Sequence, residues 1–119
     1  MVTTAATPLS GAQFDALAGA MLAAIERSVD RWLQDDVIDI DAHRTGGLLE
    51  LSFPDGSKII LNTQPPLHEL WLAAKSGGRH FKYQGGEWRD SRDGGEFLAL
   101  LSQCASAQAG RALVFDAPD

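Results

Sequence analysis

Residues 57–74, SKIILNTQPPLHELWLAA, carry the pattern that decides the fold. Apolar side chains alternate with other side chains on both sides of a double proline, and this period of two predicts two β-strands. Proline cannot donate a ladder hydrogen bond, so the two prolines mark the connection between these strands. Successive side chains of a strand point to opposite faces. If Leu70 and Leu72 enter a core, Trp71 must therefore face the other side of the sheet.

The same alternation recurs before and after this stretch. It predicts six strands, at residues 37–41, 48–53, 57–64, 67–74, 79–83 and 87–90. The segments RTGG, PDG, SGG and QGG separate them as tight turns, and Gly56 in PDG is available for a positive φ. The predicted inward-facing residues are Ile38, Ile40, Leu49, Leu51, Phe53, Ile59, Leu61, Leu70, Leu72, Phe81 and Trp88.

A helix is predicted at each end of the strand series. Ser10 and Gln13 form a capping box, and apolar residues then recur at helical spacing from Phe14 to Trp32. Residues 93–96, DGGE, repeat an Asx-x-x-Glu helix start, and Gly110 can end that second helix.

This order predicts an α+β two-layer sandwich. The N- and C-terminal helices pack on one face of an antiparallel sheet of about six strands, and the other face stays open. Residues 10–110 form a single domain between a flexible N-terminus, 1–9, and a C-terminal tail, 111–119, which can pack on the helices. Trp71 then lies on the open face beside Asn62 and Gln64.

Composition narrows the classes of protein to consider. The chain has 119 residues, 45% hydrophobic and 22% charged, as in an ordinary soluble domain. No apolar run approaches the roughly 20 residues of a membrane helix, and no signal peptide is visible, so we expect a cytoplasmic protein without membrane binding. The single cysteine, Cys104, excludes an internal disulfide and a CxxC metal site.

Negative charge is concentrated near the N-terminus. The net charge is −6, and the first 41 residues hold seven acids against two arginines, which gives −5 of that total. Such a segment repels nucleic acid and suits cations or a basic partner. We therefore expect no nucleic-acid binding.

Six of these acids are candidate metal ligands: Glu26, Asp30, Asp35, Asp36, Asp39 and Asp41. They can equally be a solvated helix face followed by an edge strand whose charges discourage β-aggregation. With no His or Cys among them, and with Arg27 and Arg31 interrupting the helix, we expect at most weak and poorly selective cation binding.

Trp71 also admits two interpretations. A neighbouring loop can cover it, or it can anchor a partner, because exposed aromatic residues are enriched at interface hot spots. The amides of Asn62 and Gln64 beside it suit the polar rim of such an interface.

Catalysis is not expected. The serines and Cys104 have no His–carboxylate partner in a recognisable arrangement, and the Gly pairs are placed as hairpin turns. The protein is therefore predicted not to be an enzyme.

Residues 55–97, from DGSKIILNTQ to SRDGGEF, resemble the frataxin family, in particular its bacterial CyaY branch. The matching pieces are the GSKII strand, the Asn-x-Gln before a proline, the PLHxxWLA strand and the GxxW hairpin before the last helix. The likeness extends over about 14–110.

The resemblance implies the same fold and a function. Frataxins bind iron weakly through acids of the first helix and first strand, and they bind the cysteine desulfurase of iron–sulfur cluster assembly, with the cluster scaffold as a second candidate partner. The expected role is thus a regulator or iron-delivery protein, with Trp71, Asn62 and Gln64 on the partner surface and His80 at its rim or as an extra iron ligand. The alternatives are an iron store or ferroxidase that oligomerises on iron binding, and an interaction domain without an iron role.

Overall fold

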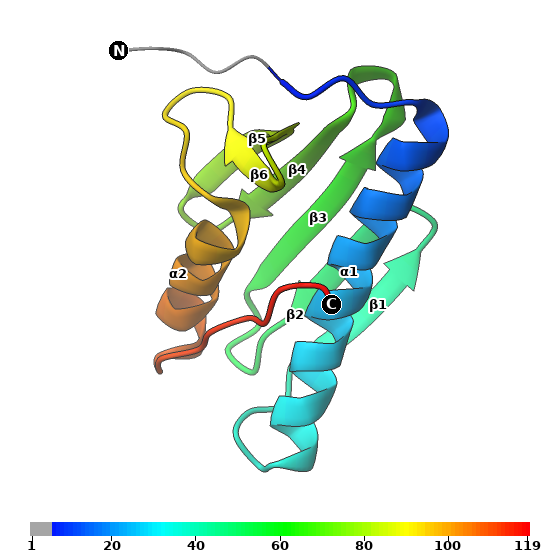
Figure 1. Ribbon diagram of the computed structural model, residues 1–119. Helices are drawn as coiled ribbons and strands as arrows, with labels where there is room; N and C mark the ends of the chain where they lie inside the picture. The colour runs from blue at the N-terminus through cyan, green and yellow to red at the C-terminus, as the bar shows by residue number, and fades with distance from the viewer. Residues whose placement is uncertain (1–5) are drawn as a thin grey trace.

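The computed structural model of the protein describes residues 6–119, and its elements form two layers (Figure 1). Helices α1 (Gly11–Gln34) and α2 (Phe97–Ala109) lie on the same side of a six-stranded antiparallel sheet. The strands follow one another in the order of the sequence: β1 (Asp41–Thr45), β2 (Leu48–Ser52), β3 (Lys58–Gln64), β4 (Glu69–Ala74), β5 (Gly77–Gln84) and β6 (Glu87–Asp90). A short 3-10 helix, η1 (Pro65–Leu67), joins β3 to β4. The predicted α+β two-layer sandwich is confirmed.

The capping box predicted for α1 is present. The Ser10 hydroxyl accepts from the Gln13 backbone N–H at 3.0 Å, and the Gln13 side-chain oxygen accepts from the Ser10 N–H at 2.8 Å. Two of the N–H groups that a helix start leaves unpaired are thus satisfied. The apolar stripe of α1, from Phe14 to Trp32, is buried against the sheet, as its spacing predicts.

The core lies between the sheet and the helices. The inward-facing residues predicted for the four central strands are all buried: Leu49, Leu51, Ile59, Leu61, Leu70, Leu72 and Phe81. Trp88 of β6 is buried too, and its indole makes an edge contact with Phe14 of α1 at 5.9 Å. This edge contact joins the end of the sheet to α1.

The first strand was predicted wrongly at 37–41, since β1 begins only at Asp41. Asp36 adopts a left-handed conformation with φ 55°, and the Val37 N–H donates back to the Trp32 carbonyl at 2.8 Å. The backbone just after α1 therefore completes the helix end and is not free to pair with β2. Ile40 is nevertheless buried, as its apolar character predicted.

Other boundaries also differ from prediction, and β2 and β3 are each one residue shorter than the predicted 48–53 and 57–64. The fourth strand begins at Glu69 and not at residue 67, because η1 and the left-handed His68 (φ 51°) occupy the positions before it. The fifth strand extends beyond the predicted 79–83, over Gly77–Gln84. The second helix is capped by Glu96, whose carboxylate accepts the N–H groups of Leu98 and Ala99, while Asp93 accepts from Gly95 in the preceding loop.

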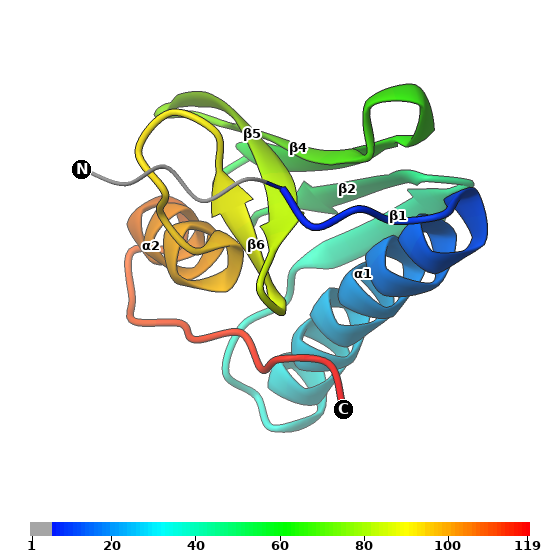
Figure 2. The same ribbon diagram turned by 45° about the horizontal axis from the view of Figure 1, so that its top comes forward.

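The C-terminal tail runs from α2 to α1 on the helical side of the molecule (Figure 2). Leu113 and Phe115 are buried, and the Phe115 ring packs edge-on against Trp32 of α1 at 4.8 Å. The Asp116 N–H donates to the buried Ser28 hydroxyl of α1 at 3.2 Å. The tail therefore contributes to the core and ties the two helices together.

Gln108 of α2 connects two hairpin turns at one end of the sheet. Its side-chain oxygen accepts from the Lys75 N–H at 3.0 Å, and its amide nitrogen donates to the Ser57 hydroxyl at 2.9 Å and the Lys58 carbonyl at 3.2 Å. Because Gln108 is only 8% exposed, these hydrogen bonds fix how α2 sits on the sheet.

At the N-terminus, residues 1–5 of the segment expected to be flexible, 1–9, lie outside the described residues. Within the rest, the Thr7 N–H donates to the Tyr83 carbonyl at 2.8 Å, and its hydroxyl accepts from the Gly85 N–H at 3.0 Å. These bonds place the start of the described chain against the β5–β6 hairpin.

Candidate functional site

Trp71 lies on the sheet face that the helices do not cover. In the strand register it is opposite Asn62 of β3 on one side and His80 of β5 on the other. Its neighbours Leu70 and Leu72 are buried beneath the helices, so the alternation read from the sequence gives the correct face for Trp71.

The indole of Trp71 is held flat against the sheet. It stacks on the His80 imidazole with the ring centroids 4.2 Å apart and the planes 6° from parallel. Its Nε1–H donates to the Glu69 carboxylate at 2.8 Å. These two contacts leave the indole half-buried and fix its orientation in the unbound protein.

Glu69 is a site residue that sequence reasoning missed. It is on the same face as Trp71, two residues earlier in β4, yet it is only 8% exposed. Besides the Trp71 indole, its carboxylate contacts Lys82 Nζ at 3.1 Å and His80 Nδ1 at 3.9 Å. The spacing of a Glu two residues before a Trp in a strand could have indicated this pair, since both side chains share a face.

The pKa of the Glu69 carboxyl lies below its ordinary value of 4.5. Burial opposes ionisation, but the hydrogen bonds from Trp71 and Lys82, together with the positive charge of Lys82, outweigh it. The Glu69 carboxyl is therefore ionised at neutral pH, and in this form it holds the Trp71 indole.

Asn62 and Gln64 extend this patch onto β3. Asn62 is opposite Trp71 and Gln64 is opposite Glu69, and both side chains are half-buried on the open face. Gln64 makes no side-chain hydrogen bond to the start of η1, and both side chains are partly accessible to solvent. The Trp71 patch, which we define as Asn62, Gln64, Glu69, Trp71 and His80, thus combines a fixed aromatic ring with amides that remain open to a partner.

The six predicted acids do not converge on one point. Glu26 is paired with Arg44 of β1 at 2.8 Å, while the others are exposed along the end of α1 and the start of β1: Asp30, Asp35, Asp36, Asp39 and Asp41. Within the described part of the chain, no group of three or more His, Cys, Asp or Glu side chains is placed to hold a metal ion. An ion at this surface would meet one or two carboxylates at a time.

Two of the acids are placed where a helix disfavours them. Asp35 is the C-cap of α1 and Asp36 follows it, so both carboxylates sit at the negative end of the helix dipole. Asp36 also adopts a backbone conformation that favours glycine or asparagine. Both carboxylates therefore interact unfavourably with the helix dipole.

His68 is separate from the Trp71 patch. Its ring stacks on Phe14 of α1 at 5.0 Å and 10°, and the left-handed backbone at this position turns it toward the helix. It is therefore a packing residue at the end of the sheet.

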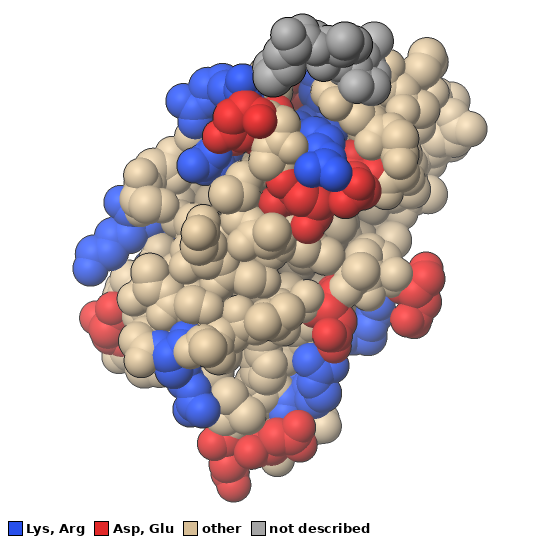
Figure 3. Space-filling model, turned by 60° about the vertical axis from the view of Figure 1, so that its left-hand side comes forward, with Lys and Arg blue, Asp and Glu red and all other residues tan. Residues whose placement is uncertain are grey.

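The surface over α2 carries no dominant charge. Seen from that side, acidic and basic side chains surround a broad uncharged area (Figure 3). The helix sequence, FLALLSQCASAQA, has no charged residue. The excess of acidic over basic residues lies instead in the first 41 residues, which carry −5 of the net charge of −6.

Among the described residues, no helix is both long enough and apolar enough to span a bilayer.

Comparison with known proteins gives one consistent result. The frataxin-like domain family matches residues 7–111. The iron–sulfur cluster assembly protein CyaY of Polaromonas sp. is 48% identical over 106 residues, covering 89% of this chain and 91% of that protein. CyaY of Paraburkholderia phymatum is 52% identical over 102 residues, covering 86% of this chain and 93% of that protein.

Solved structures agree. Frataxin from Psychromonas ingrahamii superposes with a TM-score of 0.81 at 34% identity, covering 91% of this chain and 99% of that one. A trimeric yeast frataxin complexed with ferrous iron shares the fold, with a TM-score of 0.67 at 23% identity over 88% of this chain and 90% of that one.

Proposed function

This chain belongs to the frataxin family, and we propose on that premise that it serves bacterial iron–sulfur cluster assembly as a weak iron-binding regulator or iron-delivery protein. It acts in the cytoplasm without catalysing a reaction of its own. Its principal partner is the cysteine desulfurase, with the cluster scaffold protein as a second partner. The role in cluster assembly rests on the CyaY relatives, and the choice of partners rests on the resemblance to the frataxin family. The geometry described above supports the proposed sites.

The observation that carries the proposal is the fixed indole of Trp71. A partly exposed aromatic side chain that already holds one orientation loses little rotamer freedom on binding. The His80 ring and the Glu69 carboxylate provide that orientation in the free protein. Trp71 is therefore prepared to act as the buried anchor of an interface.

The amides of Asn62 and Gln64 supply the polar part of the same interface. Each can accept and donate, and both side chains are partly accessible to solvent and hence to a partner. They border the indole, where an interface places its polar rim.

The acids provide a second, electrostatic contribution. The carboxylates of Asp35, Asp36, Asp39 and Asp41 are exposed and lie close together in sequence between α1 and β1. They steer a basic surface of the desulfurase toward the protein and raise the association rate. Because they do not converge, the same acids hold ferrous iron weakly, with Glu26 and Asp30 as outlying ligands.

Titration calorimetry with the desulfurase of the same organism tests the anchor. Trp71→Ala should weaken binding by about 1–2 kcal/mol or more, which is roughly 5- to 30-fold in Kd. Val114→Ala is the matched control, because Val114 is an exposed apolar residue on the tail, 72% exposed. If Trp71→Ala binds as tightly as the wild type while Val114→Ala does too, Trp71 is not the anchor.

The acidic contribution is tested by replacing Asp35, Asp36, Asp39 and Asp41 with Asn. This variant should bind the desulfurase more slowly at low salt and lose most of the salt dependence, and it should bind less ferrous iron. Unchanged kinetics and iron binding would remove the acids from the proposal. An iron-dependent rise in mass by light scattering would instead support a storage role.

A further inference from the structure

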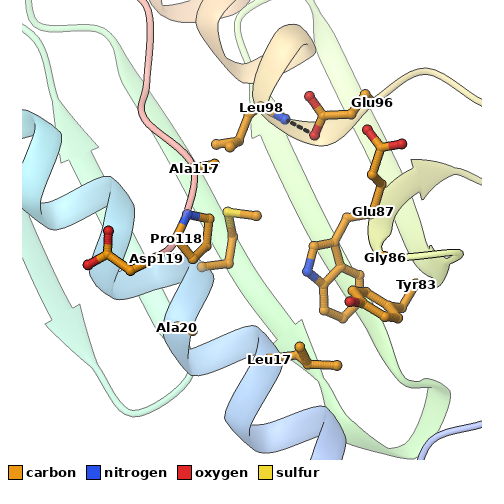
Figure 4. A pocket seen from close by; sticks show the side chains of 12 residues that line it. Leu17, Ala20, Tyr83, Gly86, Glu87, Glu96, Leu98, Ala117, Pro118 and Asp119 are labelled. Atoms are coloured by element: carbon orange, nitrogen blue, oxygen red, sulfur yellow. Dashed lines mark hydrogen bonds between the residues drawn. The ribbon is translucent and has the colours of Figure 1, made fainter.

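A cavity of about 380 Å³ lies on the helical side of the molecule, away from the Trp71 patch (Figure 4). Four segments surround it: the middle of α1, the β5–β6 hairpin, the start of α2 and residues 117–119 of the tail. The volume is in the range of natural small-molecule sites, which are typically about 300–1,000 Å³.

The walls of this cavity are mainly apolar and aromatic. Leu17 and Met21 of α1, Tyr83 and Trp88 of the hairpin and Pro118 of the tail all line it. The Tyr83 and Trp88 rings contact each other edge-on at 5.2 Å. Such walls favour the apolar body of a ligand and offer aromatic surface to a positive charge.

Every charged residue that lines the cavity is acidic. These residues are Glu87, Glu96 and Asp119, and no Lys or Arg is among the lining residues. Figure 4 shows the side chains of Glu87 and Glu96 on one side of the cavity and that of Asp119 on the opposite side. Arg89 contacts Glu87 at 2.7 Å from outside the lining and offsets part of this charge, so the remaining charge of the rim is negative.

The carboxylate of Glu96 is fixed in place by its capping role. It accepts from the Leu98 N–H at 2.8 Å and from the Ala99 N–H at 3.1 Å. The Glu96 carboxylate thus has a defined position relative to the aromatic wall. A ligand that carries its charged group at a distance from its apolar body can contact both.

We propose that this cavity binds a small organic cation, an aromatic or alkyl ammonium compound. Its apolar body would occupy the space between Met21, Leu17 and Trp88, and its ammonium group would lie at the acidic rim. The site is on the opposite layer from the Trp71 patch, so it neither requires nor excludes the partner binding proposed above.

Two-dimensional amide NMR titrations test this proposal with three probes of one size. Phenethylamine is the cation, 2-phenylethanol is the neutral analogue and 3-phenylpropanoate is the anion. In low salt, phenethylamine should shift the signals of Glu87, Trp88 and Leu98 saturably and bind at least roughly threefold tighter than the alcohol, and the anion should bind weakest.

Variants separate the site from general surface binding. Ala20→Phe should abolish the shifts, because Ala20 is an exposed lining residue of α1 whose enlargement fills the cavity without disturbing the core. Glu87→Gln should weaken phenethylamine by roughly two- to fivefold. Glu50→Gln, which removes a carboxylate from the open face, is the matched control and should change nothing.

Three outcomes would overturn the proposal. Equal binding of phenethylamine and 2-phenylethanol would show that the acidic rim contributes nothing to binding and that only the apolar walls do. An absence of saturable shifts at the lining residues, or shifts that persist in Ala20→Phe, would show that this cavity is not a binding site.

Discussion

Replacing Glu69 with Gln should destabilise the protein by about 1–2 kcal/mol at neutral pH. The Glu69 side chain is 10% exposed and accepts one hydrogen bond from the Trp71 indole at 2.8 Å and one from Lys82 at 3.1 Å. A hydrogen bond to a charged group contributes about 1.5–3 kcal/mol and a neutral one about 0.5–1.5, so a glutamine that keeps the Trp71 bond loses about 1 kcal/mol there. Lys82 is 36% exposed, so its ion pair adds at most about 0.5–1 kcal/mol.

The loss of stability caused by Glu69→Gln should become smaller as the pH falls. Because the folded pKa of Glu69 is below its ordinary value of 4.5, its ionised form is favoured by folding. This stabilisation is fully present above pH 4.5 and is lost as the pH falls through the lower folded pKa. The wild type then carries a protonated, uncharged Glu69, and its stability should approach that of Glu69→Gln.

Urea unfolding of both proteins at pH 7 and at several acidic pH values measures this difference. Glu87→Gln is the control, because Glu87 also pairs with an arginine, Arg89 at 2.7 Å, but its side chain is 50% exposed. That variant should change the free energy of unfolding by less than about 0.5 kcal/mol. A Glu69→Gln effect that equals the control at pH 7, or that stays constant down to the acid limit, would refute the reasoning.

Three other changes should alter stability, each measurable by urea unfolding. Gln108→Ala should cost about 1–3 kcal/mol, because it leaves the Lys75 N–H without its partner, and an unchanged midpoint would mean that water replaces the amide. Asp36→Gly should stabilise by about 0.5–1 kcal/mol, since φ is 55° there and the helix dipole no longer meets a carboxylate; a loss of stability would contradict this. Phe115→Ala should cost about 3 kcal/mol through the lost contact with Trp32, whereas a neutral result would show that the tail is detached in solution.

The layers of the fold could be predicted because the signals for them are local. The capping box at Ser10, the helical spacing that follows and the alternation around Leu70 and Leu72 each depend on a few neighbouring residues. The position of β1 could not be read this way. The alternation of Ile38 and Ile40 looks like a strand, but the backbone there is already committed to ending α1, and pairing with Ser52 begins only at Asp41.

The candidate site was predictable in part for the same reason. Alternation places Trp71 on the open face, and the turn between strands places Asn62 opposite it. Glu69 was missed because its role depends on Lys82 and His80, which come from the next strand. The register between β4 and β5 brings these side chains to Glu69. It is set by the length of the turn between the two strands and by where β5 begins, and neither can be derived from β4 alone.

The tail that joins the two helices has a consequence for the order in which the protein can fold during synthesis. The sheet follows the sequence strand by strand, so each strand can pair with its predecessor as it leaves the ribosome. Trp32 is made early, but its ring partner Phe115 is made near the end. The apolar stripe of α1 thus remains incompletely covered until the tail emerges, and during that interval the nascent chain is most exposed to aggregation and to chaperones.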